Sequence, residues 1–522
     1  MFPRKLPIGI QDFEYLRTNG FLYVDKTQYV YDLATFGKPY FLGRPRRFGK
    51  SLFLSTLKAY FEGKKELFEG LALSGLEKDW TEHPVIYLDF NTASYNTVET
   101  LNGVLDSVLK TYEKKWNLPP DSDIISVRFK NLIENAAGKF GQKVVVLIDE
   151  YDKSLINTMD KPQLNEEIRD VLKGFYGVLK AEDANLRFVF LTGVTKFSKV
   201  SIFSDLNQLQ DISLDSKFSG ICGITETELL NNFEPEIKNL AAKNNKSYNE
   251  ICTGLKKRYD GYHFSENLEG VYNPFSLLNT FAQCTFRYYW FATGTPTFLA
   301  KHLKETGFDI CKLENEVTIS ASSIMDYRVE NRNYVPLLYQ SGYLTIKSYD
   351  AIFDEYTLGY PNEEVKYGFL NELLPVFLPK ITANDDFSVS RFTRTLLAGD
   401  IETFMQLLKA FYAYIPYDSI ENAYKTEKYY QHIFYLLLTM MGQFVQAEVK
   451  TAQGRADAVV KLPEAIYIFE FKMANNGTAE DAIAQINDKH YAIPYSADGR
   501  KIVKIGAEFS DEERGLKRWI IE

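Results

Sequence analysis

Short, continuous runs of apolar residues alternate with helical patterns over residues 40–211. Four such runs occupy residues 40–42, 85–88, 144–148 and 188–191. Continuous apolar strands separated by helices are typical of a parallel sheet, because such a sheet is covered by helices on both faces. We therefore predict an α/β domain with a parallel sheet over residues 1–224.

The pattern of residues 225–389 is mainly helical. Turn residues such as Gly261 and Pro274 interrupt it within 259–264 and 272–275. Residues 337–346 have the pattern of a helix that ends at Gly342 and continues as a strand, which resembles the helix and wing of a small winged-helix module. We predict a helical middle region that includes a winged-helix-like part.

A third pattern begins near residue 390, and we predict a separate domain over residues 390–522. It has one long apolar helix over 429–441, then strands over 446–451, 456–462 and 465–471, then a second helix over 479–491. This order predicts a compact α/β unit. A chain of 522 residues is too long for one hydrophobic core, which agrees with several domains.

Composition and net charge argue against several classes of protein. The net charge of -9 argues against a protein that coats nucleic acid by bulk electrostatics. The 4 cysteines form no CxxC pair and the 5 histidines show no metal-ligand spacing, so neither a disulfide framework nor a zinc site is indicated. The apolar run at 433–441 is too short to span a membrane and no signal peptide is evident. We expect a cytoplasmic protein without a membrane partner.

A candidate phosphate-binding loop lies between the first apolar run and a helical pattern. Backbone N–H groups at a helix start can cradle phosphate oxygens. Lys50 would reach the β- and γ-phosphates, and Ser51 would bind Mg²⁺. The usual first glycine is replaced by Arg44, and a chance Gly-Lys-Ser at a helix start is the alternative. The loop reads Gly43-Arg44-Pro45-Arg46-Arg47-Phe48-Gly49-Lys50-Ser51.

Two further apolar runs end in residues suited to nucleotide chemistry. Residues 144–148 lead into Asp149, which would hold the Mg²⁺ shell, and Glu150, which would orient or deprotonate the attacking water. Thr192 follows the next run and would lie between the other two elements, sensing the γ-phosphate. Arg46 and Arg47 are candidates for phosphate binding or for action across a subunit interface after self-association. The alternative for Asp149 and Glu150 is a pair of solvated acids at the end of a buried strand. The alternative for Thr192 is an ordinary loop residue, and for Arg46 and Arg47 it is solvated arginines beside a loop.

Four motifs follow one another along the first half of the chain: Phe21-Leu22-Tyr23-Val24-Asp25-Lys26-Thr27, the loop from Arg44 to Ser51, Ile148-Asp149-Glu150-Tyr151-Asp152, and Phe203-Ser204-Asp205-Leu206-Asn207. Together they resemble the bacterial AAA-ATPase-like family over roughly that half. The resemblance implies a P-loop NTPase domain over residues 1–224, with an ATP-binding core related to signalling and archaeal-type P-loop ATPases. Arg44 is usual at its position in that family, and the resemblance implies no physiological role.

A second group of candidate residues lies near the C-terminus. Asp457 precedes Glu470, and strand alternation places Glu470 and Lys472 on one face. If the two strands pair, Asp457 and Glu470 would repel each other and a divalent cation would relieve the repulsion. A metal-bound water could then attack a phosphodiester, with Lys472 placing the nucleophile.

This spacing resembles the PD-(D/E)XK nuclease superfamily over about the last fifth of the chain. The resemblance implies a restriction-endonuclease-like α/β fold for this domain. Further matches are Glu427, Glu448, Gln485 and Tyr491, the last two on the second predicted helix. The resemblance implies Mg²⁺ or Mn²⁺ at Asp457 and Glu470, with DNA or RNA as substrate. A hairpin with ordinary surface acids is the alternative. Residues 421–522 hold 13 Lys or Arg and 15 Asp or Glu, so another domain or subunit would have to hold the nucleic acid.

Three functional hypotheses follow. The first is a hydrolase, a P-loop ATPase coupled to a metal-dependent nuclease that acts on nucleic acid. The second is a non-catalytic, ATP-dependent signalling or interaction switch whose nuclease-like domain is inactive. The third is a structural protein without nucleotide affinity.

Overall fold

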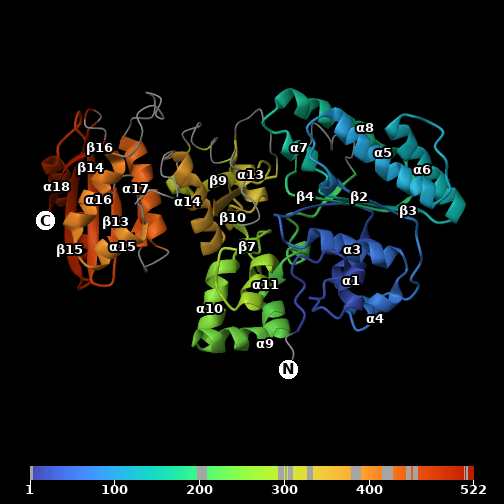
Figure 1. Cartoon of the computed structure of the whole chain (residues 1–522), viewed down its shortest axis with the longest axis horizontal. Coiled ribbons are helices and arrows are strands. Elements are labelled where there is room, and N and C mark those ends of the chain that lie inside the picture. Colours follow the sequence, from blue (N-terminus) through green and yellow to red (C-terminus); the bar gives the residue numbers. More distant parts are fainter. Residues whose placement is uncertain are drawn as a thin grey trace. The chain divides into compact units, whose positions relative to one another are not determined.

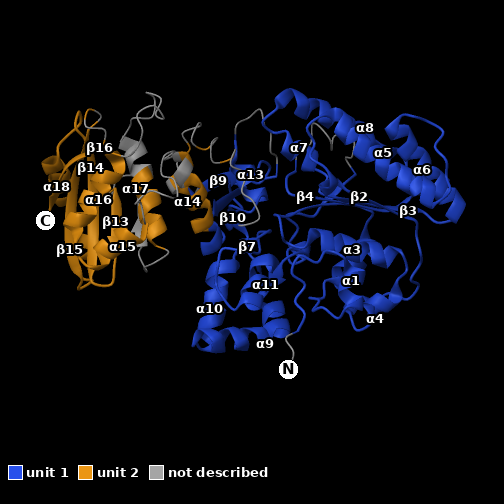
Figure 2. Cartoon of the chain, in the orientation of Figure 1, with its two compact units in different colours: residues 1–293, 313–365 blue, residues 294–312, 366–522 orange. Residues whose placement is uncertain are grey.

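The chain folds into two compact units, seen here in a computed structural model. Unit 1 comprises residues 1–293 and 313–365, and unit 2 comprises 294–312 and 366–522 (Figure 2). The motif at 203–207 lies outside the described residues. The structure describes residues 4–196, 208–291, 299, 303, 308, 310–325, 333–377, 389–413, 427–442, 448–450, 457–510, 512 and 515–522.

A parallel sheet forms the centre of the N-terminal part of unit 1. Its strands are β1 (Pro39–Gly43), β2 (Val85–Asp89), β3 (Val144–Asp149), β4 (Leu186–Gly193) and β5 (Gln210–Asp211). In space they follow the order β2-β3-β4-β1-β5, and all four pairings are parallel. The predicted parallel α/β sheet is confirmed. Since β4 lies between β1 and β3, the ends of these three strands meet at one edge.

Helices cover both faces of this sheet. Figure 1 shows α5, α6 and α8 on one side, and α1, α3 and α4 on the other. Every residue of β3 is buried, as expected for a strand covered twice. On α8, Ile168, Leu172, Phe175 and Leu179 recur at helical spacing and are buried. The helices are α1 (Phe13–Thr18), α2 (Thr27–Phe36), α3 (Lys50–Phe61), α4 (Ala72–Leu76), α5 (Val98–Lys115), α6 (Ile125–Phe140), α7 (Lys153–Asn157) and α8 (Pro162–Ala181).

Three helices follow the sheet and share an apolar core. Leu229, Phe233, Leu255 and Phe281 are buried together in it. The predicted helical middle is confirmed, with a short antiparallel sheet in the order β6-β8-β7 at its interruptions. The elements are β6 (Ile224–Thr225), α9 (Glu226–Asn244), α10 (Tyr248–Tyr259), β7 (Tyr262–His263), β8 (Gly270–Tyr272) and α11 (Pro274–Gln283).

The predicted helix, turn and strand at 337–346 are also present. Helix α13 (Val335–Gln340) is followed by Gly342, whose φ of +87° suits a residue without a Cβ, and then by β10 (Thr345–Asp350). This strand pairs with β11 (Glu355–Gly359), which also pairs with β9 (Glu314–Ser320), in an antiparallel sheet. Helix α14 (Glu363–Phe377) comes next in the chain.

Unit 2 is built on a mixed sheet in the order β12-β13-β14-β15-β16. Only β14 and β15 pair in parallel, and the intervening helix α18 packs on both of them. The elements are α15 (Val389–Leu397), α16 (Ile401–Ala413), α17 (Glu427–Met441), β12 (Glu448–Lys450), β13 (Ala458–Lys461), β14 (Ala465–Met473), α18 (Ala479–Asp488), β15 (Lys501–Ser510) and β16 (Gly515–Ile521).

One predicted boundary in unit 2 is wrong. The helix expected over 479–491 ends at Asp488, because His490 adopts φ +57° and the Tyr491 N–H then donates to the Ile486 carbonyl. Tyr491 therefore follows α18 instead of lying on it. In the described part of the chain, α17 and every other helix are too short or too polar to cross a membrane.

Candidate functional site

The predicted phosphate loop connects β1 to α3. Gly43 ends β1, and its N–H donates to Ser213 Oγ at 2.8 Å. Gly49 has φ +99° and directly precedes Lys50, the first residue of α3. A glycine adopts this left-handed conformation at little cost, and the open N–H groups of the first turn of α3 therefore adjoin the loop. This is the backbone arrangement that suits an anion.

Arg44 stabilises the loop from inside. Its side chain is buried, and its guanidinium donates to the carbonyls of Gly43 at 2.9 Å, Ser213 at 2.7 Å and Phe218 at 3.0 Å. The guanidinium carbon also lies 4.1 Å from the centroid of the Phe264 ring. The residue in place of the usual glycine therefore ties the loop to the chain after β5.

Lys50 folds back onto the loop. Its Nζ donates to the carbonyls of Arg44 at 2.9 Å and Pro45 at 3.0 Å, and the residue is only 5% exposed. A buried ammonium must be hydrogen-bonded, and these two carbonyls provide its partners. The oxygens of a polyphosphate would be stronger partners because they carry charge.

The two acids after β3 have different surroundings. Asp149 is buried, and its carboxylate accepts from Thr192 Oγ1 at 2.7 Å and from Tyr87 Oη at 3.4 Å. Glu150 is partly exposed and has φ +50°, and its Oε2 lies 3.6 Å from Lys153 Nζ. The structure thus brings Asp149 and Thr192 into direct contact, at the edge where β3 and β4 end.

Asp152 is a site residue that the sequence reasoning missed. It is 1% exposed, and its Oδ2 accepts from the N–H groups of Val194 at 3.0 Å and Thr195 at 2.6 Å. Burial raises the pKa of Asp152 to about 7, against the lowering effect of the Thr195 N–H. This carboxyl fixes the turn that carries Glu150 to the end of β4. An acid two residues after Glu150 was visible in the sequence, but its burial was not.

A cavity of about 330 Å³ opens beside the loop, and much of the predicted site lines it. One part is polar, and the rest is apolar and comes from the N-terminal segment and from α9 and α11. Such a division suits a ligand with a phosphate end and an aromatic end. The predicted residues in the lining are Arg46, Arg47, Gly49, Lys50, Ser51 and Glu150. Gly43, Asp149 and Thr192 are buried next to them.

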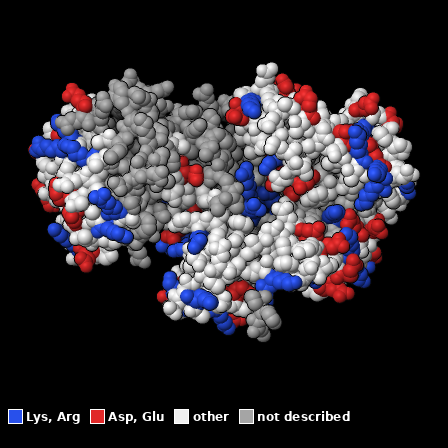
Figure 3. Space-filling view, in the orientation of Figure 1, with Lys and Arg blue, Asp and Glu red and all other residues white. Residues whose placement is uncertain are grey.

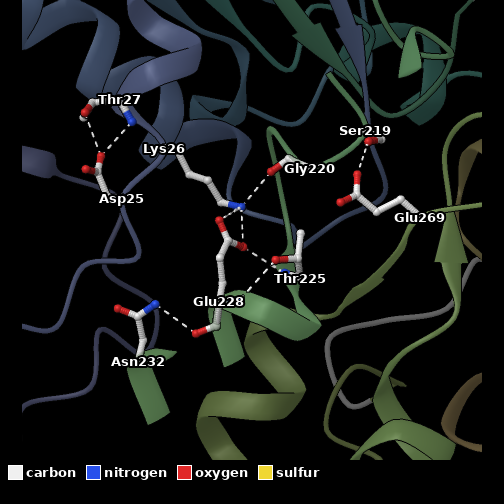
Figure 4. A network of polar contacts seen from close by, with 9 residues as sticks. All are labelled: Asp25, Lys26, Thr27, Ser219, Gly220, Thr225, Glu228, Asn232 and Glu269. Atoms are coloured by element: carbon white, nitrogen blue, oxygen red, sulfur yellow. Dashed lines mark hydrogen bonds and ion pairs between the residues drawn. The ribbon is translucent and has the colours of Figure 1, made fainter. Parts of the chain in front are cut away.

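An ion pair connects Lys26, which lines this cavity, to helix α9 (Figure 4). Lys26, from the segment before α2, donates to both carboxylate oxygens of Glu228 at 2.6 and 2.7 Å and to the Gly220 carbonyl at 2.6 Å. Glu228 belongs to α9, where it forms a capping box with Thr225. The motif at 21–27 therefore supplies a wall of the cavity, which the sequence did not indicate.

Four of the candidate residues near the C-terminus form one hydrogen-bonded group in unit 2. Lys472 Nζ lies 3.3 Å from Glu470 Oε1 and donates to Gln485 Oε1 at 2.7 Å. Gln485 Nε2 donates to Glu470 Oε1 and to Tyr491 Oη, the latter at 3.2 Å. Alternation along β14 places Glu470 and Lys472 on the face that α18 covers.

Asp457 lies next to this group. Its Oδ2 accepts from the Phe471 N–H at 2.7 Å, and the antiparallel pairing of β13 with β14 sets Ala458 opposite Phe469. Glu427 begins α17 and Glu448 begins β12, but their side chains lie outside the described residues. Within the described ranges, no cluster of three or more His, Cys, Asp or Glu side chains is placed to hold a metal ion. Figure 3 shows Lys and Arg interspersed with Asp and Glu on the visible face of unit 2.

Comparison with known families agrees with both predicted resemblances. Residues 7–203 match the family described as "Predicted AAA-ATPase", and residues 425–519 match the "PD-(D/E)XK nuclease superfamily". The fold and these matches define an α/β protein with an AAA-ATPase-like domain followed by a nuclease-superfamily domain.

A full-length relative supports the same assignment. The protein described as "Uncharacterized protein in vnfD 5'region", from Azotobacter chroococcum mcd 1, is 39% identical over 528 residues, which cover 100% of this chain and 99% of that protein. This chain belongs to the predicted AAA-ATPase family and carries a C-terminal domain of the PD-(D/E)XK nuclease superfamily. Both predicted resemblances are confirmed.

Proposed function

We propose that this protein is a cytoplasmic ATPase whose nucleotide state controls a metal-dependent nuclease domain acting on DNA or RNA. The ATPase would occupy residues 1–224, a helical middle 225–389, and the nuclease domain 390–522. The observation that carries the proposal is the placement of Lys50 and Glu150 in the lining of one cavity, next to the contact between Asp149 and Thr192.

The residues of the first site divide the work of ATP hydrolysis. Lys50 would leave the loop carbonyls and bind the β- and γ-phosphates, with Arg46 and Arg47 beside it. Ser51 and Asp149 would hold Mg²⁺, which neutralises phosphate charge when bound. Glu150 would orient a water and accept its proton as the water oxygen bonds to the γ-phosphorus. The bridging oxygen then leaves with ADP, and Thr192 keeps Asp149 in place.

Nucleotide binding is the first test. We expect the wild-type chain to bind an ATP analogue with Mg²⁺, and Lys50→Ala to weaken that binding about a hundredfold or more, because a charged hydrogen-bond donor to phosphate is lost. Lys180→Ala, an exposed lysine on α8, is the matched control. Equal, negligible affinity in wild type and Lys50→Ala would refute the ATPase proposal and favour a structural role.

The second site supports metal-assisted phosphodiester cleavage. Asp457 and Glu470 would bind Mg²⁺ or Mn²⁺, and Lys472 would place the nucleophile. Glu427, Glu448, Gln485 and Tyr491 would complete or orient the site. We expect wild type to nick DNA or RNA with either metal, and Asp457→Ala to abolish this. If both proteins are equally inert on all nucleic acids tested, the catalytic assignment is wrong.

One observation favours the second hypothesis, a non-catalytic switch. Glu470 Oε1 accepts from Lys472 and Gln485, and Asp457 accepts from the Phe471 N–H, so each of these acids has partners within the protein. Nucleotide affinity combined with no metal-dependent cleavage would support the switch.

A further inference from the structure

Among the described residues, five cationic side chains line the cavity. Four of them are either held by other groups of the protein or belong to the phosphate loop. Lys26 is held by Glu228, and Lys50 by the loop carbonyls. Arg46 and Arg47 belong to the loop, and the Arg47 guanidinium lies 5.1 Å from the centroid of the Phe275 ring. Lys153 is the fifth, and it faces Glu150.

The position of Lys153 is set by a rigid turn. Its N–H donates to the Glu150 carbonyl at 2.9 Å, and Glu150 occupies the left-handed region at φ +50°. The Tyr151 N–H donates to the Thr192 carbonyl at 2.9 Å, and the buried Asp152 carboxyl accepts two N–H groups after β4. The turn from β3 into α7 is therefore attached to the strand beside β1, which leads into the phosphate loop.

The ion pair between Lys153 and Glu150 is exchangeable. The Nζ to Oε2 distance is 3.6 Å, and the two side chains are 26% and 19% exposed, respectively. A partly exposed pair of this kind contributes little to stability. A γ-phosphate carries more negative charge than one carboxylate, so it would compete well for the ammonium.

We infer that Lys153 is a γ-phosphate sensor that holds Glu150 when no γ-phosphate is present and releases it when ATP binds. The inference rests on the proposed ATP hydrolysis and assigns a further residue to that site. In the diphosphate or empty state, the ammonium pairs with Glu150. When ATP is bound, the ammonium contacts a γ-phosphate oxygen, stabilises charge during transfer, and leaves Glu150 able to accept the proton of water. The chain thereby supplies from its own α7 a cation close to the phosphate that is transferred.

The test compares triphosphate with diphosphate. Affinities for a non-hydrolysable ATP analogue and for ADP, each with Mg²⁺, are measured by calorimetry for wild type, Lys153→Met, Lys153→Arg and the control Lys180→Ala, and kcat is measured for each. We expect Lys153→Met to lower the ratio of triphosphate to diphosphate affinity about tenfold, with ADP affinity unchanged, and to lower kcat about a hundredfold. Lys153→Arg should recover most of the affinity ratio, because it restores the charge.

Each outcome decides one question. A Lys153→Met protein with the wild-type affinity ratio and kcat would overturn the inference while leaving the ATPase proposal intact. Equal losses of ADP and analogue affinity would overturn it too, since they would indicate a structural role. Absence of nucleotide binding in wild type would overturn both, and the Lys50→Ala comparison identifies that case.

Discussion

The cavity beside the predicted phosphate loop and the C-terminal acidic group are both rich in charge, but their charges are neutralised in different ways. In the cavity, Lys50 donates to two backbone carbonyls, and the predicted lining residues surround about 330 Å³ of space. In unit 2, Glu470, Lys472 and Gln485 already bond to one another. A polyphosphate would replace the neutral carbonyl partners of Lys50, whereas a metal ion at Glu470 would have to displace the Lys472 ammonium and the Gln485 amide. We therefore expect ligand binding to require more rearrangement at the second site than at the first.

The largest expected effect tests whether the two sites are chemically independent. Glu150→Gln should lower ATP turnover about a thousandfold while leaving ATP affinity within a few-fold, because it removes a proton acceptor and keeps the shape. Turnover is measured by phosphate release and affinity by calorimetry. Glu470→Gln is the matched variant and should leave ATP turnover unchanged while abolishing metal-dependent cleavage. A parallel loss of ATP turnover in Glu470→Gln would show that the two sites are not chemically independent.

The next effect concerns a buried acid behind the phosphate loop. Glu364 is fully buried, accepts from Ser276 Oγ at 2.9 and 2.7 Å and from the Trp290 N–H at 2.9 Å, and burial raises its pKa to about 7. Trp290 Nε1 in turn donates to the Arg46 carbonyl at 3.1 Å. In the unfolded chain this carboxyl is exposed to water and has the ordinary glutamate pKa of 4.5. Between these two values the folded state binds the extra proton.

The free energy of unfolding should therefore fall as pH rises from about 4.5 to about 7, on the order of 3 kcal/mol from this group. Asp152 acts in the same direction, because its pKa is also raised. Glu364→Gln should remove the Glu364 part of this slope. Urea unfolding at several pH values, monitored by intrinsic fluorescence, measures how the free energy of unfolding depends on pH. An identical slope in wild type and Glu364→Gln would contradict the prediction.

A smaller effect compares two glycines, one in each region. A Cβ on Gly193 would lie 2.7 Å from both Asp152 Oδ1 and the Tyr151 ring, and a Cβ on Gly506 would lie 2.5 Å from the Ala479 carbonyl oxygen. Either alanine variant should cost about 2 kcal/mol through overpacking. Gly193→Ala should also reduce ATP turnover, and Gly506→Ala should reduce metal-dependent cleavage, because each added methyl group would displace residues next to its own site. Gly138→Ala, with open space around it, is the control.

The smallest effect tests the prepositioned group in unit 2. Gln485→Ala should weaken Mn²⁺ binding about tenfold, because Gln485 orients Glu470 and Lys472. Calorimetric titration with Mn²⁺ measures this, and the exposed Asp488→Asn on the same helix controls for loss of a surface acid. Tighter Mn²⁺ binding in Gln485→Ala would show instead that the amide competes with the metal.

Much of the architecture was predictable because a strand that is buried on both faces has a continuous run of apolar residues. The run that forms β3 and the loop before α3 can both be recognised in the sequence. The pairing of β13 with β14 was anticipated only conditionally, and β15 and β16 were not predicted. The end of α18 before Tyr491 depends on the conformation of His490, which no apolar period encodes. The roles of the predicted site residues remain predictions.

The sequence by itself determined the kinds of element and the chemical groups at their ends, since periodicity and residue type act over a few neighbouring positions. Only the tertiary structure decided which distant groups meet. Lys26 and Glu228 are 202 positions apart, and Arg44 reaches a carbonyl 174 positions away. Asp152 is a buried acid because the end of β4 packs against the turn that carries it. Such contacts arise from the packing of whole elements, so no short stretch of sequence specifies them.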